Sequence, residues 1–500
     1  MKHRRTMRLA AAAVAAGVAA PVAAVGSGAA TADAASSVVI KAMLPPSTGL
    51  ITAADNKGLA NLTRQYEKMH PGVTVDWLPE NTTSITQANA TVESQASGGA
   101  APDLVWEQYG PVTSGSVPAG LLQNIKPYLE KPNPYVKGNK SWLSLFPSSV
   151  IPYMTSPNGN IDIILGSAVE TGMFYNKAMF AKAKISSAPT TWAQFMADLK
   201  KLKAARLQPL VFADGGLCNP SWFERLATSS LLANQVKLFD VNHAQVTTGL
   251  DAAVGIHKGI ISMKNPRYAE VWKLLGALAP YNYSGASTYD ACTSQTATTP
   301  PLDSQALLSE GKAAIVWGGS WYIPNLNSIG FRNKYGVFPE PTITKATTRF
   351  ARNTITRGVI GGPNGNGQWG VTTQKADSSM TPAKTATVMN FLAWLFKPAN
   401  LGNFINQSQK GGEIPIEIGA PTLNLPGLKN LLPSGKVPTV VDVVLDDVLG
   451  TAPTNSGLRL VQEYLDGSLS YASFATQWQS LLTTAANSWA AQNHVNLSKY

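Results

Sequence analysis

Residues 168–177 read Ala168-Val169-Glu170-Thr171-Gly172-Met173-Phe174-Tyr175-Asn176-Lys177, and the chain continues to Pro189-Thr190-Thr191-Trp192. Glu170 is the single acid of this otherwise apolar segment, and burying an unpaired carboxylate is costly. A ligand hydroxyl or a cationic neighbour would relieve that cost, so Glu170 is the first candidate for a binding residue. A carboxylate at a hinge, bonded to backbone amides, is the alternative interpretation.

Helix and strand patterns alternate along the chain. Thr191 can cap a helix whose apolar residues share one face, and a short buried strand follows at 210–212. An earlier unit places apolar residues at helical spacing over 59–69, followed by a turn and an alternating strand at 73–77. This alternation predicts an α/β architecture. Amphipathic helices are also predicted at 304–311, 383–396 and 458–482, and long loops at 281–301 and 421–438.

The N-terminus has the form of an export signal. Residues 1–34 combine a basic start, an Ala/Val-rich stretch at 9–25 and small residues around Ala34, which is typical of a secretory signal peptide. A twin-arginine signal at Arg4-Arg5 and a retained membrane anchor are the alternatives. No later apolar stretch approaches 18 residues, so the mature chain is expected to be exported and soluble. At 500 residues the chain is too long for one compact core, and two lobes are expected.

Charge and cysteine content narrow the possible partners. The formal charge is +11, and it falls to +8 when residues 1–34, with four Lys/Arg and one Asp, are removed. The basic residues form no run of five and no helical stripe, which argues against a nucleic-acid partner. Cys218 and Cys292 are the only cysteines. An even count in an exported chain predicts one disulfide, with two buried free thiols as the alternative, and no metal site.

Several segments resemble, in the same order, the extracellular solute-binding proteins of ATP-dependent importers, and most closely the carbohydrate-binding branch of that family. The resemblance covers roughly 38–480 and is most specific at 168–177 with 189–192. The matching segments are 62–73, 98–105, 120–125, 168–177 with 189–192, and 311–314 with 318–321.

The resemblance implies a two-lobed, periplasmic-binding-protein-like α/β fold with a hinge and an interlobe ligand cleft. It places the N-terminal lobe at 38–165 plus 366–415 and the C-terminal lobe at 166–365 plus 416–500. Many family members from single-membrane bacteria carry a cysteine for lipid attachment just after the signal, and this chain has none near Ala34. The segment 281–301, which contains Cys292, has no counterpart in the family pattern.

A sugar offers CH faces and many hydroxyls, so its site needs flat aromatic rings together with carboxylates and amides. Four tryptophans stand where such rings are useful, beside Cys218, around Gly318-Gly319 or in a Gly-rich stretch; they are Trp222, Trp317, Trp321 and Trp369. The Gly318-Gly319 pair would let the backbone approach a ligand, which favours Trp321. In the resembling fold the loop after the strand at 104–105 faces the cleft, which adds Glu107, Gln108 and Tyr109 as candidates.

Enzyme motifs are absent from the sequence: it holds no Gly-x-Ser-x-Gly, His-Glu-x-x-His or Cys-x-x-Cys. Gly365-x-Gly367-x-x-Gly370 matches a dinucleotide fingerprint formally, but a strand is predicted after it where the motif needs a helix. The adjacent acids Asp446 and Asp447 are interpreted as a solvated helix start. We therefore expect a binding protein without cofactor or catalytic residues.

The predicted function is capture of a small ligand, a sugar or oligosaccharide, by closure of two lobes. The protein is expected to be an exported monomer that hands its ligand to the membrane subunits of an ATP-dependent importer. A secreted carbohydrate-active hydrolase, in which a carboxylate pair comes from distant segments, is the first alternative. A solute-sensing subunit of a signalling system is the second.

Overall fold

The computed structural model describes residues 37–44, 57–78, 85–107, 116–117, 119–293, 297–352, 360–362, 367–425, 431 and 438–500. The predicted signal peptide at 1–34 lies outside the described residues, as does most of the loop predicted at 421–438. Among the described residues, no helix is both long enough and apolar enough to cross a membrane.

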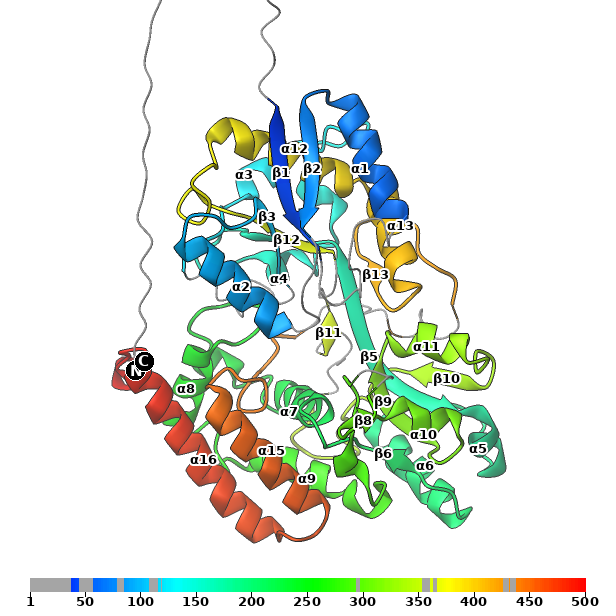
Figure 1. Cartoon of the computed structure of the whole chain (residues 1–500). Helices are drawn as coiled ribbons and strands as arrows, with labels where there is room; N and C mark the ends of the chain where they lie inside the picture. Colours follow the sequence, from blue (N-terminus) through cyan, green and yellow to red (C-terminus); the bar gives the residue numbers. More distant parts are fainter. Residues whose placement is uncertain are drawn as a thin grey trace, which may run out of the picture. The chain divides into compact units, whose positions relative to one another are not determined.

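Within the described ranges, the first sheet has five strands in the order β2-β1-β3-β12-β4. Three of them run parallel to one another, and β12 is antiparallel to both of its neighbours. Their bounds are Val38–Met43 (β1), Val73–Leu78 (β2), Leu104–Trp106 (β3), Ile163–Leu165 (β4) and Gln368–Val371 (β12). In Figure 1, β1 and β2 lie side by side with α1 (Lys57–Met69) next to them.

The apolar residues predicted for the helix at 59–69 explain how α1 packs. Leu59, Leu62 and Tyr66 are buried in the core of the first sheet, whereas Met69 is exposed at the end of the helix. Two later helices complete this core, α12 (Pro382–Leu395) and α13 (Pro398–Gln409). The helix predicted at 383–396 is thus confirmed within a residue of its ends.

The second sheet is built around β5 (Ser167–Asn176), in the order β10-β5-β9-β6. The other strands are β6 (Leu210–Val211), β9 (Ile315–Gly319) and β10 (Tyr335–Phe338), while β11 (Gly361–Gly362) and β13 (Ile414–Pro415) pair with the first residues of β5. The strand predicted at 210–212 is β6, and it is buried as expected.

Capping residues set the helix starts around β5. Asn176 ends the strand, and its side chain accepts hydrogen bonds from two backbone N–H groups of α5 (Lys177–Lys182). Thr191 caps α6 (Trp192–Ala204) in a capping box with Gln194, so the predicted cap is confirmed. The buried face of α6 carries the apolar residues that the sequence pattern indicates: Trp192, Phe195, Leu199 and Leu202.

The C-terminal region corrects one prediction. Residues 458–482 are expected to form one helix, but the structure has α15 (Thr451–Leu465) and α16 (Tyr471–Gln492), which lie side by side in Figure 1. Gly467 takes a positive φ of 85°, which no regular helix allows, and Ser470 then caps α16. The apolar pattern continues across the break because both helices pack on one core.

The remaining elements are further helices and short connections around the two sheets. They are α2 (Ile85–Ser97), α3 (Lys126–Leu129), η3 (Trp142–Leu145), α4 (Ile151–Met154), α7 (Cys218–Leu231), η4 (Val236–Leu238), α8 (Gly249–His257), α9 (Pro266–Gly276), α10 (Gln305–Ser309), α11 (Tyr322–Ser328) and η7 (Leu497–Lys499). The loop expected at 281–301 contains short elements: η6 (Ala286–Thr288) and β7 (Tyr289–Asp290), after η5 (Ala279–Tyr281). Here β7 pairs with β8 (Leu302–Asp303).

The chain passes between the two sheets at a tightly bonded junction. Gly166 separates β4 from β5; its N–H donates to Gly367 O at 2.6 Å, and its carbonyl accepts from Ile416 N at 3.1 Å. The Ser167 hydroxyl donates to Glu413 Oε2 at 2.8 Å and accepts from Gly367 N at 3.0 Å. Three segments distant in sequence therefore meet where the chain leaves the first sheet.

Candidate functional site

Pairing of β5 with β9 brings Glu170 close to the Gly318-Gly319-Ser320-Trp321 segment. Thr171 pairs with Gly319, and one residue further on Ser320 N donates to Glu170 O at 2.8 Å. Trp321 directly follows, at the start of α11. Glu170 within β5 and Trp321 just beyond the end of β9 thus belong to paired backbone segments.

Trp321 is fixed on several sides and keeps part of its surface exposed. Its indole N–H donates to the Ala291 carbonyl at 3.3 Å, and its ring meets Trp222 edge-on at a centroid distance of 5.9 Å. A Cβ on Gly319 would lie 2.0 Å from Trp321 Cζ3. The interpretation of this glycine as space for a ligand is therefore wrong, because the ring of Trp321 itself occupies that space.

The other two tryptophans of this cluster are covered by protein. Trp317 is 1% exposed, and its indole N–H donates to Glu340 Oε1 at 3.0 Å. It therefore cannot offer a face to a ligand in this structure, and its assignment as a stacking platform is corrected. Trp222 is 8% exposed and packs between the rings of Trp317 and Trp321, so it supports Trp321 more than it presents a surface.

Trp369 lies in a different part of the chain, and its assignment as a ligand-binding residue is also corrected. It belongs to strand β12 and is fully buried, whereas a Gly-rich loop was expected. Its indole N–H donates to Met43 O at 3.2 Å, and its ring packs against Phe404 at 5.9 Å. Trp369 is thus a core residue of the first sheet. Gly370 lies in the same strand, and among the described residues the next helix is α12, which begins only at Pro382, in agreement with rejecting the dinucleotide fingerprint.

Glu170 is 1% exposed, and within the described part of the chain no group donates to its Oε1. Burial raises the pKa of Glu170 well above its ordinary value, and the nearby Glu340 raises it further, against a hydrogen bond from the Gly362 N–H. The low-dielectric surroundings and the like charge therefore favour the neutral form of this carboxyl over the ionised form. Glu340 also accepts a hydrogen bond from the Thr171 hydroxyl.

The candidates at 107–109 are only partly described. Glu107 directly follows β3 and is buried, as expected for a residue at a strand end. Gln108 and Tyr109 lie outside the described residues. Their proposed contact with ligand stays a prediction.

Sequence reasoning missed a charged group on α7. Arg225 forms a bidentate ion pair with Asp442, at 2.6 and 3.0 Å, and its Nη2 reaches Asp446 Oδ1 at 3.0 Å. Arg225 stands three residues after Trp222 and hence on the same helix face, which is the signal that would have indicated it. Asp446 is thus an ion-pair partner and not part of a solvated helix start. Asp447 points elsewhere, since its Oδ1 accepts from the Thr454 hydroxyl at 3.2 Å.

Tyr153 of α4 was also missed. Burial raises the pKa of the Tyr153 phenol, and the nearby Glu170 and Asp442 raise it further. The positive charge of Arg225 and a hydrogen bond between Tyr153 and Gln245 lower it. Tyr153 packs against the core of the first sheet, whereas these partners belong to segments around the second. The residues near Glu170 therefore come from both halves of the structure.

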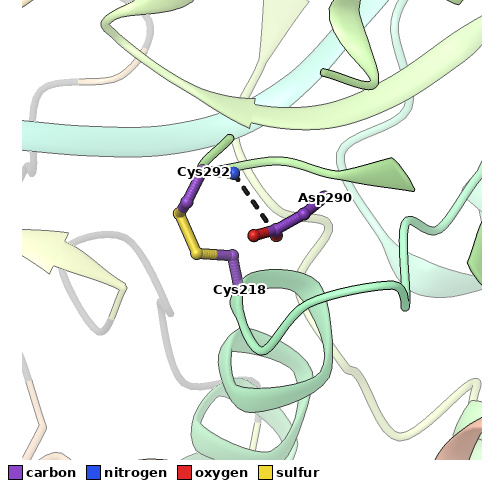
Figure 2. A group of neighbouring side chains, drawn as sticks. All are labelled: Cys218, Asp290 and Cys292. Carbon is purple, nitrogen blue, oxygen red and sulfur yellow. Dashed lines mark hydrogen bonds between the residues drawn. A yellow bond between two sulfur atoms is a disulfide. The ribbon is translucent and has the colours of Figure 1, made fainter. Parts of the chain in front are cut away.

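The cysteine prediction is confirmed. Cys218 and Cys292 form a disulfide with their Cα atoms 6.1 Å apart. Asp290 lies beside them, and its carboxylate accepts from Cys292 N at 3.3 Å (Figure 2). These three side chains come within 4.8 Å of one another, as metal ligands do, but sulfurs bonded to each other are not thiolate ligands.

Helix α7 also carries Glu224, whose ionisation should make stability depend on pH. Glu224 accepts from Tyr268 Oη at 3.1 Å and from Leu445 N at 2.9 Å, yet burial raises its pKa from 4.5 to about 7. Both folded and unfolded chains hold this proton below pH 4.5, and only the unfolded chain releases it between pH 4.5 and 7. As the pH rises from 4.5 to 7, the free energy of unfolding therefore decreases, and Glu224 contributes about 3 kcal/mol to that decrease.

Glu224→Gln should lessen that fall, because glutamine does not titrate. Urea unfolding of the wild type and the variant at pH 4.5 and pH 8 measures the decrease in the free energy of unfolding. An equal decrease in the wild type and the variant would show that Glu224 has an ordinary pKa in the folded protein.

The fold and the site together define a class of two-lobed α/β binding protein. The family model described as "Bacterial extracellular solute-binding protein" matches residues 61–421, which is more than half of the chain. The chain therefore belongs to the bacterial extracellular solute-binding proteins. No curated protein sequence matches it.

Solved structures agree with this assignment at the level of the fold. A chitin oligosaccharide binding protein is 19% identical, with 90% of this chain and 99% of that chain covered and a TM-score of 0.58. The apo form of RafE from Streptococcus pneumoniae is 14% identical, with 90% and 99% covered and a TM-score of 0.60. A probable secreted solute-binding lipoprotein from Streptomyces coelicolor is 15% identical, with 91% and 99% covered and a TM-score of 0.60. The predicted two-lobed, periplasmic-binding-protein-like fold class is thus confirmed.

Proposed function

We propose that this protein captures a sugar or oligosaccharide by closure of its two lobes and delivers it to an ATP-dependent importer. The observation that carries the proposal is the partly exposed Trp321, which directly follows the residue that hydrogen-bonds to the backbone of the buried Glu170 through the pairing of β5 with β9. An indole face can stack on the CH face of a pyranose ring. A carboxyl group can accept hydrogen bonds from sugar hydroxyls, and its neutral form can also donate one.

The described relatives support the same ligand class. The similar structures include a chitin oligosaccharide binding protein, RafE in complex with raffinose, and a receptor reported to prefer β-D-galactopyranose. Their identities of 14% to 19% carry the fold and leave the particular sugar open. Family and neighbours are binding proteins, which favours capture over hydrolysis.

The lobes of the proposed mechanism follow the two sheets. One hydrophobic core surrounds the first sheet and draws on residues between 40 and 165 and between 369 and 405, while another surrounds the second. This distribution supports lobes at 38–165 plus 366–415 and at 166–365 plus 416–500. The junction around Gly166 and Ser167 would then be the hinge. Within this scheme Glu107, Gln108 and Tyr109 would approach the ligand from the N-terminal lobe.

Export and transport complete the proposal. The match to extracellular solute-binding proteins and the form of residues 1–34 support secretion with cleavage of a signal peptide. We propose a monomer that is extracellular or associated with the cell surface, and no cysteine for lipid attachment follows Ala34 closely. The membrane subunits of the importer would recognise the closed, ligand-bound form.

A thermal-shift screen of the mature protein tests the proposal. Raffinose, chitotriose, maltotriose and galactose are each added at millimolar concentration. A ligand that binds only the folded state stabilises it by about 2.7 kcal/mol at one hundred times its Kd, so at least one sugar should raise the Tm by several degrees. Reducing ends are assayed in the same samples. Steady release of reducing ends, or no shift with any sugar, would contradict the proposal.

A further inference from the structure

The disulfide ties a short segment of the chain, Asp290–Cys292, to the start of α7. Cys218 is the first residue of that helix, and Cys292 lies 74 residues further along the chain. Cys292 is exposed, whereas Ala291 is fully buried. Helix α7 carries Trp222 and Arg225, so the disulfide joins the segment to an element of the proposed sugar site.

Asp290 makes a second connection to the same helix end. Leu217, at the N-cap position of α7, provides no side-chain cap, and the Asp290 carboxylate instead accepts from the Cys218 N–H. A Cβ on Gly216 would lie 2.3 Å from Asp290 Oδ2, so the chain before the helix fits closely around this carboxylate. Gly215 N also donates to Tyr289 O at 2.8 Å. The segment is therefore held at its backbone, at a carboxylate and at a sulfur.

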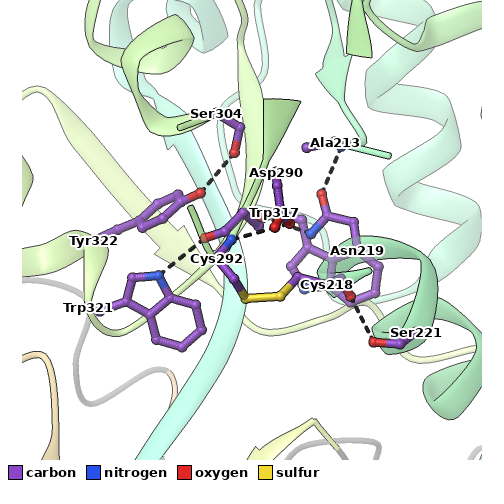
Figure 3. Close-up of a disulfide and its surroundings, with 11 residues drawn as sticks. Ala213, Cys218, Asn219, Ser221, Asp290, Cys292, Ser304, Trp317, Trp321 and Tyr322 are labelled. Atoms are coloured by element: carbon purple, nitrogen blue, oxygen red, sulfur yellow. Dashed lines mark hydrogen bonds between the residues drawn. A yellow bond between two sulfur atoms is a disulfide. The ribbon is translucent and has the colours of Figure 1, made fainter. Parts of the chain in front are cut away.

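Ala291, between these two anchors, contacts the aromatic residue of the site. Its carbonyl accepts the indole N–H of Trp321, and Figure 3 shows that indole beside the disulfide. The indole ring also lies against Gly319, so the hydrogen bond to Ala291 fixes its remaining rotation about the side-chain bonds. Both chain neighbours of Ala291 are bound to Cys218 at the start of α7.

We propose that Asp290–Cys292 is a positioning segment for sugar binding, in which the disulfide holds the Ala291 carbonyl and that carbonyl orients the Trp321 indole. The functional consequence of this inference is weaker sugar binding without the disulfide, and that part rests on the proposed function. Its structural part, the orientation of Trp321, stands without any ligand. A ring that is already fixed in the free protein stacks on a ligand more favourably, because ordering a mobile side chain on binding costs free energy.

A ligand-free measurement tests the structural part. Indole N–H signals of 15N-labelled protein are recorded for the wild type and for the double variant Cys218→Ser with Cys292→Ser, and Trp321→Phe assigns the signal of Trp321. We expect that signal to move and its hydrogen exchange to quicken at least about tenfold, the effect of losing a buried hydrogen bond. Trp478, whose indole donates to Tyr268 Oη at 3.0 Å in the C-terminal helical core, is the internal control and should not change.

A titration tests the functional part. Raffinose and chitotriose are titrated calorimetrically into the wild type, the double Cys→Ser variant and the same pair in a Trp321→Ala background. Affinity should fall about tenfold without the disulfide, and this fall should vanish once Trp321 is absent, as a double-mutant cycle requires of coupled residues. Circular dichroism checks the fold at the assay temperature. The comparison is repeated with wild-type protein reduced with TCEP. This reduced protein replaces the variant if the variant does not fold.

The outcomes separate the two proposals. An unchanged Trp321 signal and unchanged affinity in the folded double variant would overturn the positioning role and leave sugar binding intact. An equal loss of affinity with and without Trp321 would also overturn it. If neither sugar binds oxidised wild-type protein, the proposed ligand class is wrong for these sugars, and the indole signal alone decides the orientation of Trp321.

Discussion

Trp321→Ala should weaken sugar binding at least about thirtyfold while the protein stays folded. Loss of stacking and of apolar burial at an aromatic hot spot costs on the order of 2–4 kcal/mol of binding free energy. The structure supports this choice over the other candidate tryptophans, because Trp321 keeps part of its surface exposed whereas Trp222, Trp317 and Trp369 are buried. Calorimetric titration with the sugar that gives the largest thermal shift measures the effect.

Trp489→Ala is the matched control for this experiment. Trp489 is also a partly exposed indole that lies against a glycine, since a Cβ on Gly249 would lie 2.4 Å from its Nε1. It belongs to α16, in the C-terminal helical core. Its removal should lower stability and leave sugar affinity within about twofold. Equal affinity losses in the two variants, or none in a folded Trp321→Ala protein, would mean that the binding platform lies elsewhere.

Helix starts and strand patterns were predictable because their causes are local. Thr191 and Gln194 stand three residues apart, and that spacing alone indicates a capping box. The apolar residues of α1 likewise share one face by spacing alone. The break between α15 and α16 was not predicted, since apolar residues continue on both sides and only the positive φ of Gly467 marks the turn.

The roles of the tryptophans depend on contacts that no local pattern encodes. Trp317 and Trp321 flank the same two glycines, yet Trp317 lies inside β9 against Glu340 and Trp321 stands beyond the end of that strand. The sequence shows that Gly319 lacks a Cβ and cannot show which group fills the space. In the structure a side chain two residues away fills it.

Arg225 shows the same limit for charge. Its partner Asp442 is 217 residues away, so no spacing rule connects the two. The ion pair exists only where the fold brings α7 and the segment before α15 into contact. Asp446 was misinterpreted for the same reason, because an acid shortly before a helix is usually solvated, and this one meets an arginine.

Trp369→Ala should lower the free energy of unfolding by about 3–5 kcal/mol, the usual cost of removing a large aromatic side chain from a core. Trp369 is fully buried among aromatic residues of the first sheet, and its substitution by Ala also removes the hydrogen bond from the indole N–H to the Met43 carbonyl. Trp369→Phe keeps a ring and loses only part of this energy. Urea unfolding measures both variants against the wild type.

Sugar affinity decides between a core role and a ligand role for Trp369. We expect Trp369→Phe, which leaves most of the packing in place, to bind the sugar as the wild type does within about twofold. Trp369→Ala should do so as well at temperatures where circular dichroism shows it to be folded. The opposite result, near-native stability with affinity lost, would return Trp369 to the ligand site. The indole would then have to leave a position in which the structure gives it no exposed surface.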